Sequence, residues 1–189
     1  MRNKEADFFE AMYKKDPDPW KFASSEYELN RYKQIYNALN YKYYDLILEP
    51  ACSIGVLTEQ LSTLANSVKA FDISSRAVSL ATKRCAHLSN VSISCNSIED
   101  YSIERNADLI ILSEIGYYFD SKRWRKIVTH LIEKSPKSTI FLASHWLGYS
   151  QDHNISGDEV HLIIHSINEL SFEYGERNAN FRIDRWKKK

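Results

Sequence analysis

Short apolar runs alternate with longer amphipathic stretches along most of this chain. Five short runs rich in apolar residues predict strands, at residues 45–48, 68–71, 91–95, 107–112 and 139–143. The last two are almost continuously apolar, as expected of central strands buried on both faces. Helical periodicity or composition between and before these runs predicts helices at residues 26–39, 56–65, 75–87 and 122–134. Strands that alternate with helices in this way indicate a doubly wound parallel sheet.

The C-terminal part of the chain departs from this alternation. Residues 157–168 have the pattern of a helix, and residues 170–177 and 180–186 have the pattern of two strands. Their connection is short enough for a hairpin, which pairs strands antiparallel. The expected fold class is therefore α/β, with a mostly parallel seven-stranded sheet that ends in an antiparallel hairpin.

Length and charge restrict the classes of function. The chain has 189 residues, which favours one domain, and we expect a helical cap segment at 1–44 and a Rossmann-like core at 45–189. Lysine plus arginine and aspartate plus glutamate each total 25, so no overall field attracts nucleic acid or an anionic membrane. Neither partner is expected.

Cysteine usage and hydropathy bear on the compartment. The three cysteines form no C-x-x-C pair, which argues against a disulfide framework and favours a reducing cytoplasm. No segment approaches the roughly 18 apolar residues of a membrane span. We expect a soluble cytoplasmic protein.

A turn of small residues followed by an acidic residue carries the strongest functional signal. Residues 49–55 form the turn. Asp72 ends the second predicted strand, roughly 20 residues beyond the turn. At this place a carboxylate can accept both ribose hydroxyls. Asp72 could instead cap the next helix. Gly55 is the only glycine between residues 46 and 72, which argues against a dinucleotide site, because pyrophosphate must approach glycine amides.

The turn resembles motif I of the S-adenosylmethionine-dependent methyltransferases, an acidic residue followed by spaced glycines. Glu49, Ala51, Ser53 and Gly55 occupy the positions of that pattern. Ala51 and Ser53 replace two glycines, and close backbone approach stays sterically possible on the condition that φ is negative at both, since a Cβ disfavours the left-handed region. The resemblance implies S-adenosylmethionine as cofactor. Glu49 could contact the amino group of its methionine part or interact with a helix dipole.

A wider resemblance covers nearly the whole chain. The segment DLIILSEIGYYF at 108–119 is similar to a segment of the nodulation protein S family of small methyltransferases. Other motifs agree in order, namely DPDPW at 16–20, E-P-x-C-x-x-G at 49–55, Asp72, GDEVH at 157–161 and FRIDRW at 181–186. This resemblance implies the class I methyltransferase fold and methyl transfer to an amine. For nodulation protein S the acceptor is the glucosamine nitrogen of a chitin oligosaccharide, so a small-molecule or carbohydrate acceptor is expected.

The carboxyl ends of the strands, where ligands bind in such sheets, supply most of the expected cofactor site. Ser97 falls where the resembled enzymes place a polar residue against adenine, although a loop role without ligand remains open. Arg31 is a candidate partner for the cofactor carboxylate, and Trp20 is a candidate aromatic residue in the lining of the pocket. The complete expected cofactor site is Trp20, Arg31, Glu49, Ala51, Gly55, Asp72, Ile73, Ser97, Ile98 and Ser113.

Transfer to an amine needs a proton acceptor but no covalent nucleophile. The candidates are Glu114, His145 and His153. Glu114 and His145 follow strands four and five, although either could be structural. Tyr117 and His153 are expected in the acceptor pocket. His161 and His165 lack the acidic signature of zinc enzymes, so no metal is expected. The alternative function is a non-catalytic, methyltransferase-like binding protein.

Overall fold

A single mixed sheet organises the molecule. A computed structural model describes residues 2–101 and 106–189, which form a seven-stranded sheet of order β3-β2-β1-β4-β5-β7-β6. The strands are β1 (Tyr44–Pro50), β2 (Ala65–Asp72), β3 (Val91–Cys95), β4 (Leu109–Ser113), β5 (Ile140–Trp146), β6 (Leu170–Arg177) and β7 (Phe181–Lys188). Strand β7 runs antiparallel to both β5 and β6, while β1 to β5 pair in parallel. The expected fold class is confirmed.

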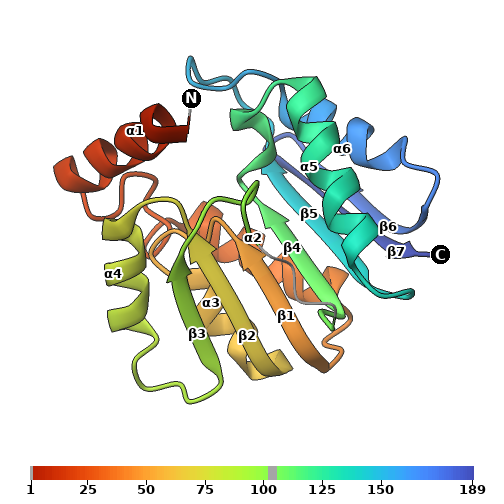
Figure 1. The fold of residues 1–189 in the computed structure, drawn as a ribbon, viewed down its shortest axis with the longest axis horizontal. Coiled ribbons are helices and arrows are strands. Elements are labelled where there is room, and N and C mark those ends of the chain that lie inside the picture. Colours follow the sequence, from red (N-terminus) through yellow and green to blue (C-terminus); the bar gives the residue numbers. More distant parts are fainter. Residues whose placement is uncertain (1, 102–105) are drawn as a thin grey trace.

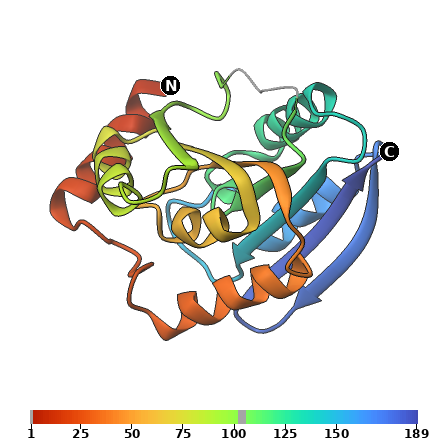
Figure 2. The same cartoon turned by 90° about the horizontal axis from the view of Figure 1, so that it is seen from below.

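Six helices accompany the strands in the described residues. They are α1 (Arg2–Lys15), α2 (Glu26–Ala38), α3 (Val56–Leu61), α4 (Ser75–Arg84), α5 (Ser121–Lys134) and α6 (Gly157–His165). Helices α2, α3 and α4 cover one face of the sheet, and α5 and α6 cover the other (Figures 1 and 2). Helix α1 lies beyond the carboxyl ends of the parallel strands (Figure 1). None of the described helices has the length and hydropathy needed to span a bilayer.

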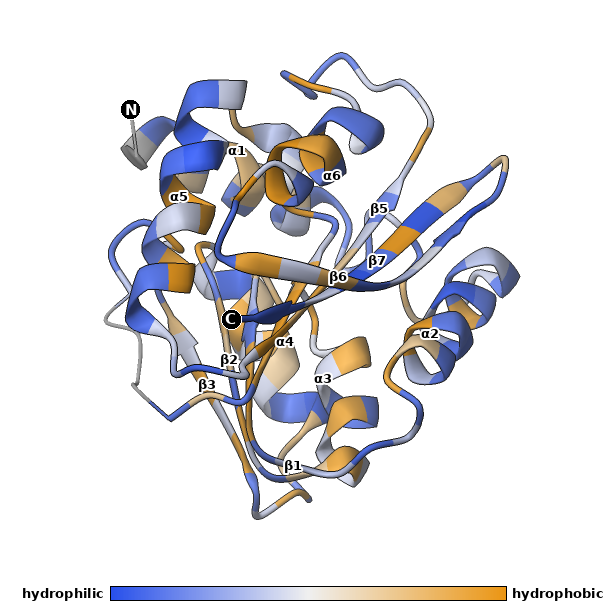
Figure 3. Ribbon diagram, turned by 90° about the vertical axis from the view of Figure 1, so that its right-hand side faces the viewer, coloured by the Kyte–Doolittle hydropathy of each residue, from blue (hydrophilic) through white to orange (hydrophobic). Residues whose placement is uncertain are grey.

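Two hydrophobic layers hold the helices on the sheet. In β4, Ile110 and Leu112 belong to the cluster with α5 and α6, while Leu109 and Ile111 belong to the cluster with α2 and α3. Because alternate side chains of a strand point to opposite faces, a strand covered on both faces must be apolar at every position. The helices instead mix hydrophilic and hydrophobic residues (Figure 3), since only one side of each is buried.

Several element boundaries differ from those expected. The predicted helix 56–65 ends at Leu61 and continues as a 3₁₀ turn, because residues from Ala65 onward pair with β1. Strand β5 reaches Trp146 instead of residue 143, because β7 pairs with it along its whole length. Helix α1 lies within the helical cap segment expected at 1–44, although its own bounds were not predicted. Ser74 caps α4 through a hydrogen bond from the amide of Ala77 (3.2 Å).

Candidate functional site

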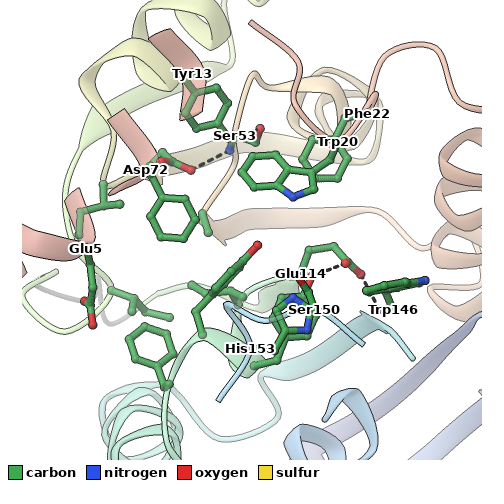
Figure 4. A pocket seen from close by; sticks show the side chains of 18 of the residues that line it. Glu5, Tyr13, Trp20, Phe22, Ser53, Asp72, Glu114, Trp146, Ser150 and His153 are labelled. Atoms are coloured by element: carbon green, nitrogen blue, oxygen red, sulfur yellow. Dashed lines mark hydrogen bonds between the residues drawn. The ribbon is translucent and has the colours of Figure 1, made fainter. Parts of the chain in front are cut away.

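A cavity of about 410 Å³ opens at the carboxyl ends of the parallel strands, beneath α1 (Figure 4). It lies where open α/β sheets bind ligands, and its volume is within the range of small-molecule sites. Most of the predicted site residues line it, namely Trp20, Ala51, Asp72, Ile73, Ser97, Ile98, Glu114, Tyr117 and His153. The structure therefore brings together residues from distant parts of the chain.

Asp72 ties the turn after β1 to the end of β2. Its Oδ2 accepts a hydrogen bond from the amide of Ser53 (2.9 Å, Figure 4), and its Oδ1 accepts one from the amide of Ser74 (2.9 Å). Burial raises the pKa of this carboxyl to about 6, and the amide hydrogen bonds limit the rise. Each oxygen keeps a further lone pair, so Asp72 can accept additional donors from the cavity.

The turn adopts a conformation that its sequence did not indicate. Ala51 and Ser53 have φ angles of 55° and 51°, and Gly55 has 77°, so the condition of negative φ at the two replaced positions is not met. The amide of Ser53 reaches Asp72, and its hydroxyl lies 2.5 Å from the Tyr13 hydroxyl. These contacts hold a left-handed backbone that costs about 1–2 kcal/mol for a residue with a Cβ. The turn thus keeps a glycine-like path while presenting two side chains to the cavity.

Gly55 and Glu49 support this turn from behind. Gly55 does not line this cavity, and a Cβ added to it would lie 3.0 Å from Cβ of Ala81, so the turn packs closely on α4. Glu49 accepts a hydrogen bond from the Thr58 hydroxyl (2.6 Å), which links β1 to α3. Burial raises the pKa of Glu49 to about 8, so this side chain is mostly protonated near neutral pH.

A second group of polar side chains lies at the end of β4. Glu114 has a φ of 53°; its Oε1 accepts the amide of Trp146 (2.9 Å, Figure 4), and its Oε2 accepts the Tyr117 hydroxyl. The ring of His153 stacks on Tyr117 with centroids 3.8 Å apart. Burial lowers the pKa of His153. Glu114 is thus oriented towards the cavity by two donors.

Arg31 is buried behind Glu114, beside a smaller cavity of about 30 Å³ that Glu49 and Ser113 also line. Its guanidinium donates to Glu28 (2.6 Å), to Ser113 (2.8 Å) and to Ser144 (3.1 Å). Desolvation would lower the pKa of Arg31, but Glu114 and Glu28 outweigh it and raise the pKa. Arg31, Glu49 and Ser113 therefore lie next to the main cavity and not in its wall.

His145 lies elsewhere than expected. It is fully buried in β5 and lines neither cavity, because the strand continues past the predicted end and carries the side chain into the layer under α6. Its Nε2 already accepts the amide of Gly116 (3.0 Å), and burial lowers its pKa well below the usual range. This geometry gives His145 no access to a substrate proton.

Several lining residues were missed by the sequence reasoning. Glu5 and Phe9 reach the cavity from α1, and the ring of Phe9 lies 5.0 Å from that of Tyr118. The four-residue spacing of Phe9 and Tyr13 places them on one face of a helix and could have indicated a buried face there. The surface that this face covers could not be identified without the fold. The acidic residues of the lining are Glu5, Glu28, Asp72 and Glu114, and among the described residues that line it none is lysine or arginine.

No group of three or more histidine, cysteine, aspartate or glutamate side chains in residues 2–101 and 106–189 is arranged to hold a metal ion. The chemistry that the cavity offers is that of carboxylates beside aromatic rings. Glu5 is paired with Arg123, and Glu28 and Glu114 are paired with Arg31. The attraction of the lining for cations therefore comes mainly from Asp72 and from the negative faces of the rings.

Comparisons with known proteins give a consistent result. The family model for nodulation protein S (NodS) matches residues 5–145, more than half of the chain. The chain is 25% identical over 104 residues to nodulation protein S of Sinorhizobium fredii and 27% identical over 131 residues to that of Bradyrhizobium diazoefficiens. These alignments cover 54% and 67% of this chain, and 48% and 62% of the relatives. The chain thus spans less than two thirds of these curated relatives.

A solved structure shares the fold over almost the full length. It is the N-methyltransferase NodS of Bradyrhizobium japonicum in complex with S-adenosyl-L-homocysteine, with a TM-score of 0.84 and 19% sequence identity. The alignment covers 97% of each chain.

Proposed function

We propose that this chain, which belongs to the nodulation protein S family, binds S-adenosylmethionine and transfers its methyl group to an amine nitrogen. The observation that carries the proposal is the acidic and aromatic cavity beside Asp72, which suits a sulfonium cofactor and an amine acceptor. The name of the related N-methyltransferase supports the same reaction.

The residues around Asp72 fit the adenosyl half of the cofactor. The carboxylate of Asp72 would accept the ribose hydroxyls, since its amide hydrogen bonds leave lone pairs free. Ile73, Ser97 and Ile98 line the cavity beside it and would hold the adenine. The turn from Ala51 to Gly55, with Trp20, would face the methionine part, and the buried groups Arg31, Glu49 and Ser113 would support it from behind.

The reaction places modest demands on the protein. When bound, the cofactor supplies an activated methyl group, so no covalent nucleophile is needed. The chain must align the acceptor and keep its nitrogen unprotonated. We propose that Glu114 takes the amine proton, because its carboxylate faces the cavity and two donors fix its orientation. Tyr117 and His153 form the adjoining acceptor wall.

We propose a small-molecule or carbohydrate amine as the acceptor. Support comes from the family's acceptor class, the limited cavity volume and the balanced charge of the chain, which provides no field for nucleic acid or an anionic membrane. The cytoplasm is the proposed location.

The test combines cofactor titration with an acceptor screen. Calorimetry with S-adenosylmethionine and S-adenosylhomocysteine should show binding, and amino sugars should be methylated while their hydroxyl analogues are not. Glu114→Gln should keep cofactor binding and lose most methyl transfer. Absence of binding at millimolar cofactor would reject the proposal.

A non-catalytic binding protein is the second candidate, and it is favoured by the side chains that Ala51 and Ser53 add to the turn. It predicts cofactor or partner binding without turnover on any amine of the screen. Glu114→Gln would then change neither activity nor binding.

A further inference from the structure

A buried chain of hydrogen bonds runs behind the wall of the cavity. His145 Nε2 lies 3.0 Å from the amide nitrogen of Gly116, and its Nδ1 lies 3.1 Å from His161 Nε2. His161 Nδ1 lies 2.8 Å from Asp184 Oδ2. The two histidines are fully buried and Asp184 is 2% exposed. His161 and Asp184 belong to the motifs GDEVH and FRIDRW, to which the proposed function gives no role.

Only one arrangement of protons satisfies every contact in this chain. The amide of Gly116 can only donate, so Nε2 of His145 carries no proton and Nδ1 of the neutral ring must carry it. That proton is donated to Nε2 of His161, whose own proton is then on Nδ1 and is donated to Asp184. Arg182 Nε also donates to Asp184 (2.7 Å), which favours the ionised carboxylate at the far end.

The surroundings favour neutral rings. Burial is the main cause of the lowered pKa of His145, and three groups that face it lower the pKa further: His161 from α6, Arg31 from α2 and His153 from the loop after β5. Burial also lowers the pKa of His161. Asp184 and Asp158 act in the opposite direction and raise this pKa, while Arg182 lowers it, and the net result is a lowered pKa. Both rings therefore stay neutral, as the proton arrangement requires.

The near end of the chain holds the bend that carries Glu114. Gly116 follows Glu114 by two residues, and a Cβ at Gly116 would lie 2.4 Å from Val160 and 2.9 Å from Trp124, so its backbone is pressed against α6 and α5. The backbone of Glu114 is left-handed, which is unfavourable for a residue with a Cβ, so neighbouring contacts must offset this strain. An acceptor for the Gly116 amide is such a contact.

We propose that His145, His161 and Asp184 are positioning residues, which hold the bend of residues 114–116 so that Glu114 faces the cavity. The positions of the protons on these side chains are a property of the folded chain and do not depend on the proposed enzyme activity. Their effect on turnover rests on the proposed methyl transfer.

The first test reads the proton order directly. Nitrogen-15 NMR of the imidazoles in the wild-type protein should show the Nδ1–H form for both His145 and His161, with signals assigned by their loss in His145→Gln and His161→Gln. Free histidine favours the other tautomer, so an unstructured or differently bonded ring would give Nε2–H. An Nε2–H signal from either ring would overturn the proposal, whatever the enzyme activity.

The second test separates positioning from general stability. His145→Leu removes the acceptor for Gly116 and should lower kcat on the order of 100-fold, with little change in the cofactor KM, because Asp72 lies on another strand end. His145→Gln restores an acceptor and should recover most of the rate. His130→Gln, an exposed change on α5, is the matched control.

Equal kcat in folded His145→Leu and wild type would overturn the positioning role. If the wild type methylates no amine, the proposed function fails, while the NMR tautomers still decide whether the proton order exists.

Discussion

At the residue scale, Glu49 gives the protein a measurable pH dependence. Its pKa is about 8 in the folded chain, against an ordinary value of 4.5. Between these values the folded state holds a proton that the unfolded state has lost, so the free energy of unfolding falls as pH rises from about 5 to 8. One such group contributes a slope of about 1.4 kcal/mol per pH unit.

Glu49→Gln should therefore flatten the stability curve in that range and raise the free energy of unfolding near pH 8, because the amide needs no proton to stay neutral. Urea unfolding at a series of pH values measures this. Asp72, with a pKa of about 6, adds a slope of the same sign up to that value, and it is present in both proteins. Glu133→Gln, at an exposed position on α5, should leave the curve unchanged; parallel curves for wild type and Glu49→Gln would refute the assignment.

Asp72 has a structural contribution and a proposed binding contribution, and two substitutions separate them. Asp72→Ala removes the acceptor for two amides and should destabilise the fold, and it should also cost about 1.5–3 kcal/mol of cofactor binding. Asp72→Asn keeps one acceptor oxygen and should recover part of the stability while binding cofactor more weakly than wild type. Calorimetric titration of each folded variant measures the effect. Unaltered affinity in both would remove Asp72 from the cofactor site.

The conformation of the turn illustrates what single residues do not reveal. Asp72 could be identified from its position after a strand, since strand ends meet at one edge of the sheet. The positive φ angles of Ala51, Ser53 and Glu114 could not be predicted from the sequence, because residues with a Cβ disfavour the left-handed region. The contacts that stabilise this conformation come from residues distant in the sequence.

At the element scale, the parallel strands and most of their connecting helices follow from hydrophobic periodicity, while their ends do not. Strand β2 begins at Ala65, in a polar stretch that reads equally as the end of a helix, because it pairs with β1. Strand β5 extends to Trp146 because β7 pairs with it. His145 was expected near the pocket because the strand was predicted to end at residue 143, which would leave His145 in a loop that can face a ligand. In the structure it lies within β5, where a side chain of a covered strand faces a helix.

The packing of α3 on α4 depends on Gly55. Gly55→Ala should destabilise the fold by about 1–2 kcal/mol for the left-handed backbone, and a further 1–3 kcal/mol for overpacking against Ala81. Ala81→Gly alone should cost about 1 kcal/mol as a helix substitution. If the two sites are in contact, the double variant should be more stable than the sum of the single effects. Additive free energies of unfolding would show that the contact carries no strain.

At the scale of the whole molecule, the sequence predicts the sheet better than it predicts the enclosure of the cavity. The alternation of strands and helices restricts the topology strongly, because crossovers between parallel strands have one preferred hand. No comparable rule fixes where the N-terminal helix packs, and its amphipathic pattern does not indicate which surface it covers. In the structure, Glu5, Phe9 and Tyr13 place α1 over the cavity.

Charged contacts at two places fasten α1 across the strand ends. Glu10 accepts the hydroxyls of Ser74 (2.5 Å) and Ser75 (3.0 Å) at the start of α4, and Glu5 pairs with Arg123 of α5. Arg123 also binds Glu99, so a single guanidinium joins α1, α5 and the loop after β3. Since exposed ion pairs contribute about 0–1 kcal/mol each, α1 should be the part of the cavity wall that opens most easily.

Arg123→Gln should loosen α1 without disturbing the sheet. Limited proteolysis should cut the variant faster within residues 2–15, and cofactor affinity should fall up to about fivefold, the equivalent of 1 kcal/mol. Arg125→Gln, an exposed change on the same helix, removes equal charge and should alter neither quantity. The free energy of unfolding should fall by about 1–2 kcal/mol in Arg123→Gln, which loses partly exposed ion pairs and the position of the guanidinium over the Phe119 ring (4.9 Å to the centroid), and should stay unchanged in Arg125→Gln. Equal proteolysis rates in Arg123→Gln and wild type would mean that the Glu10 contacts and the apolar contacts of Phe9 and Tyr13 hold α1 in place without Arg123.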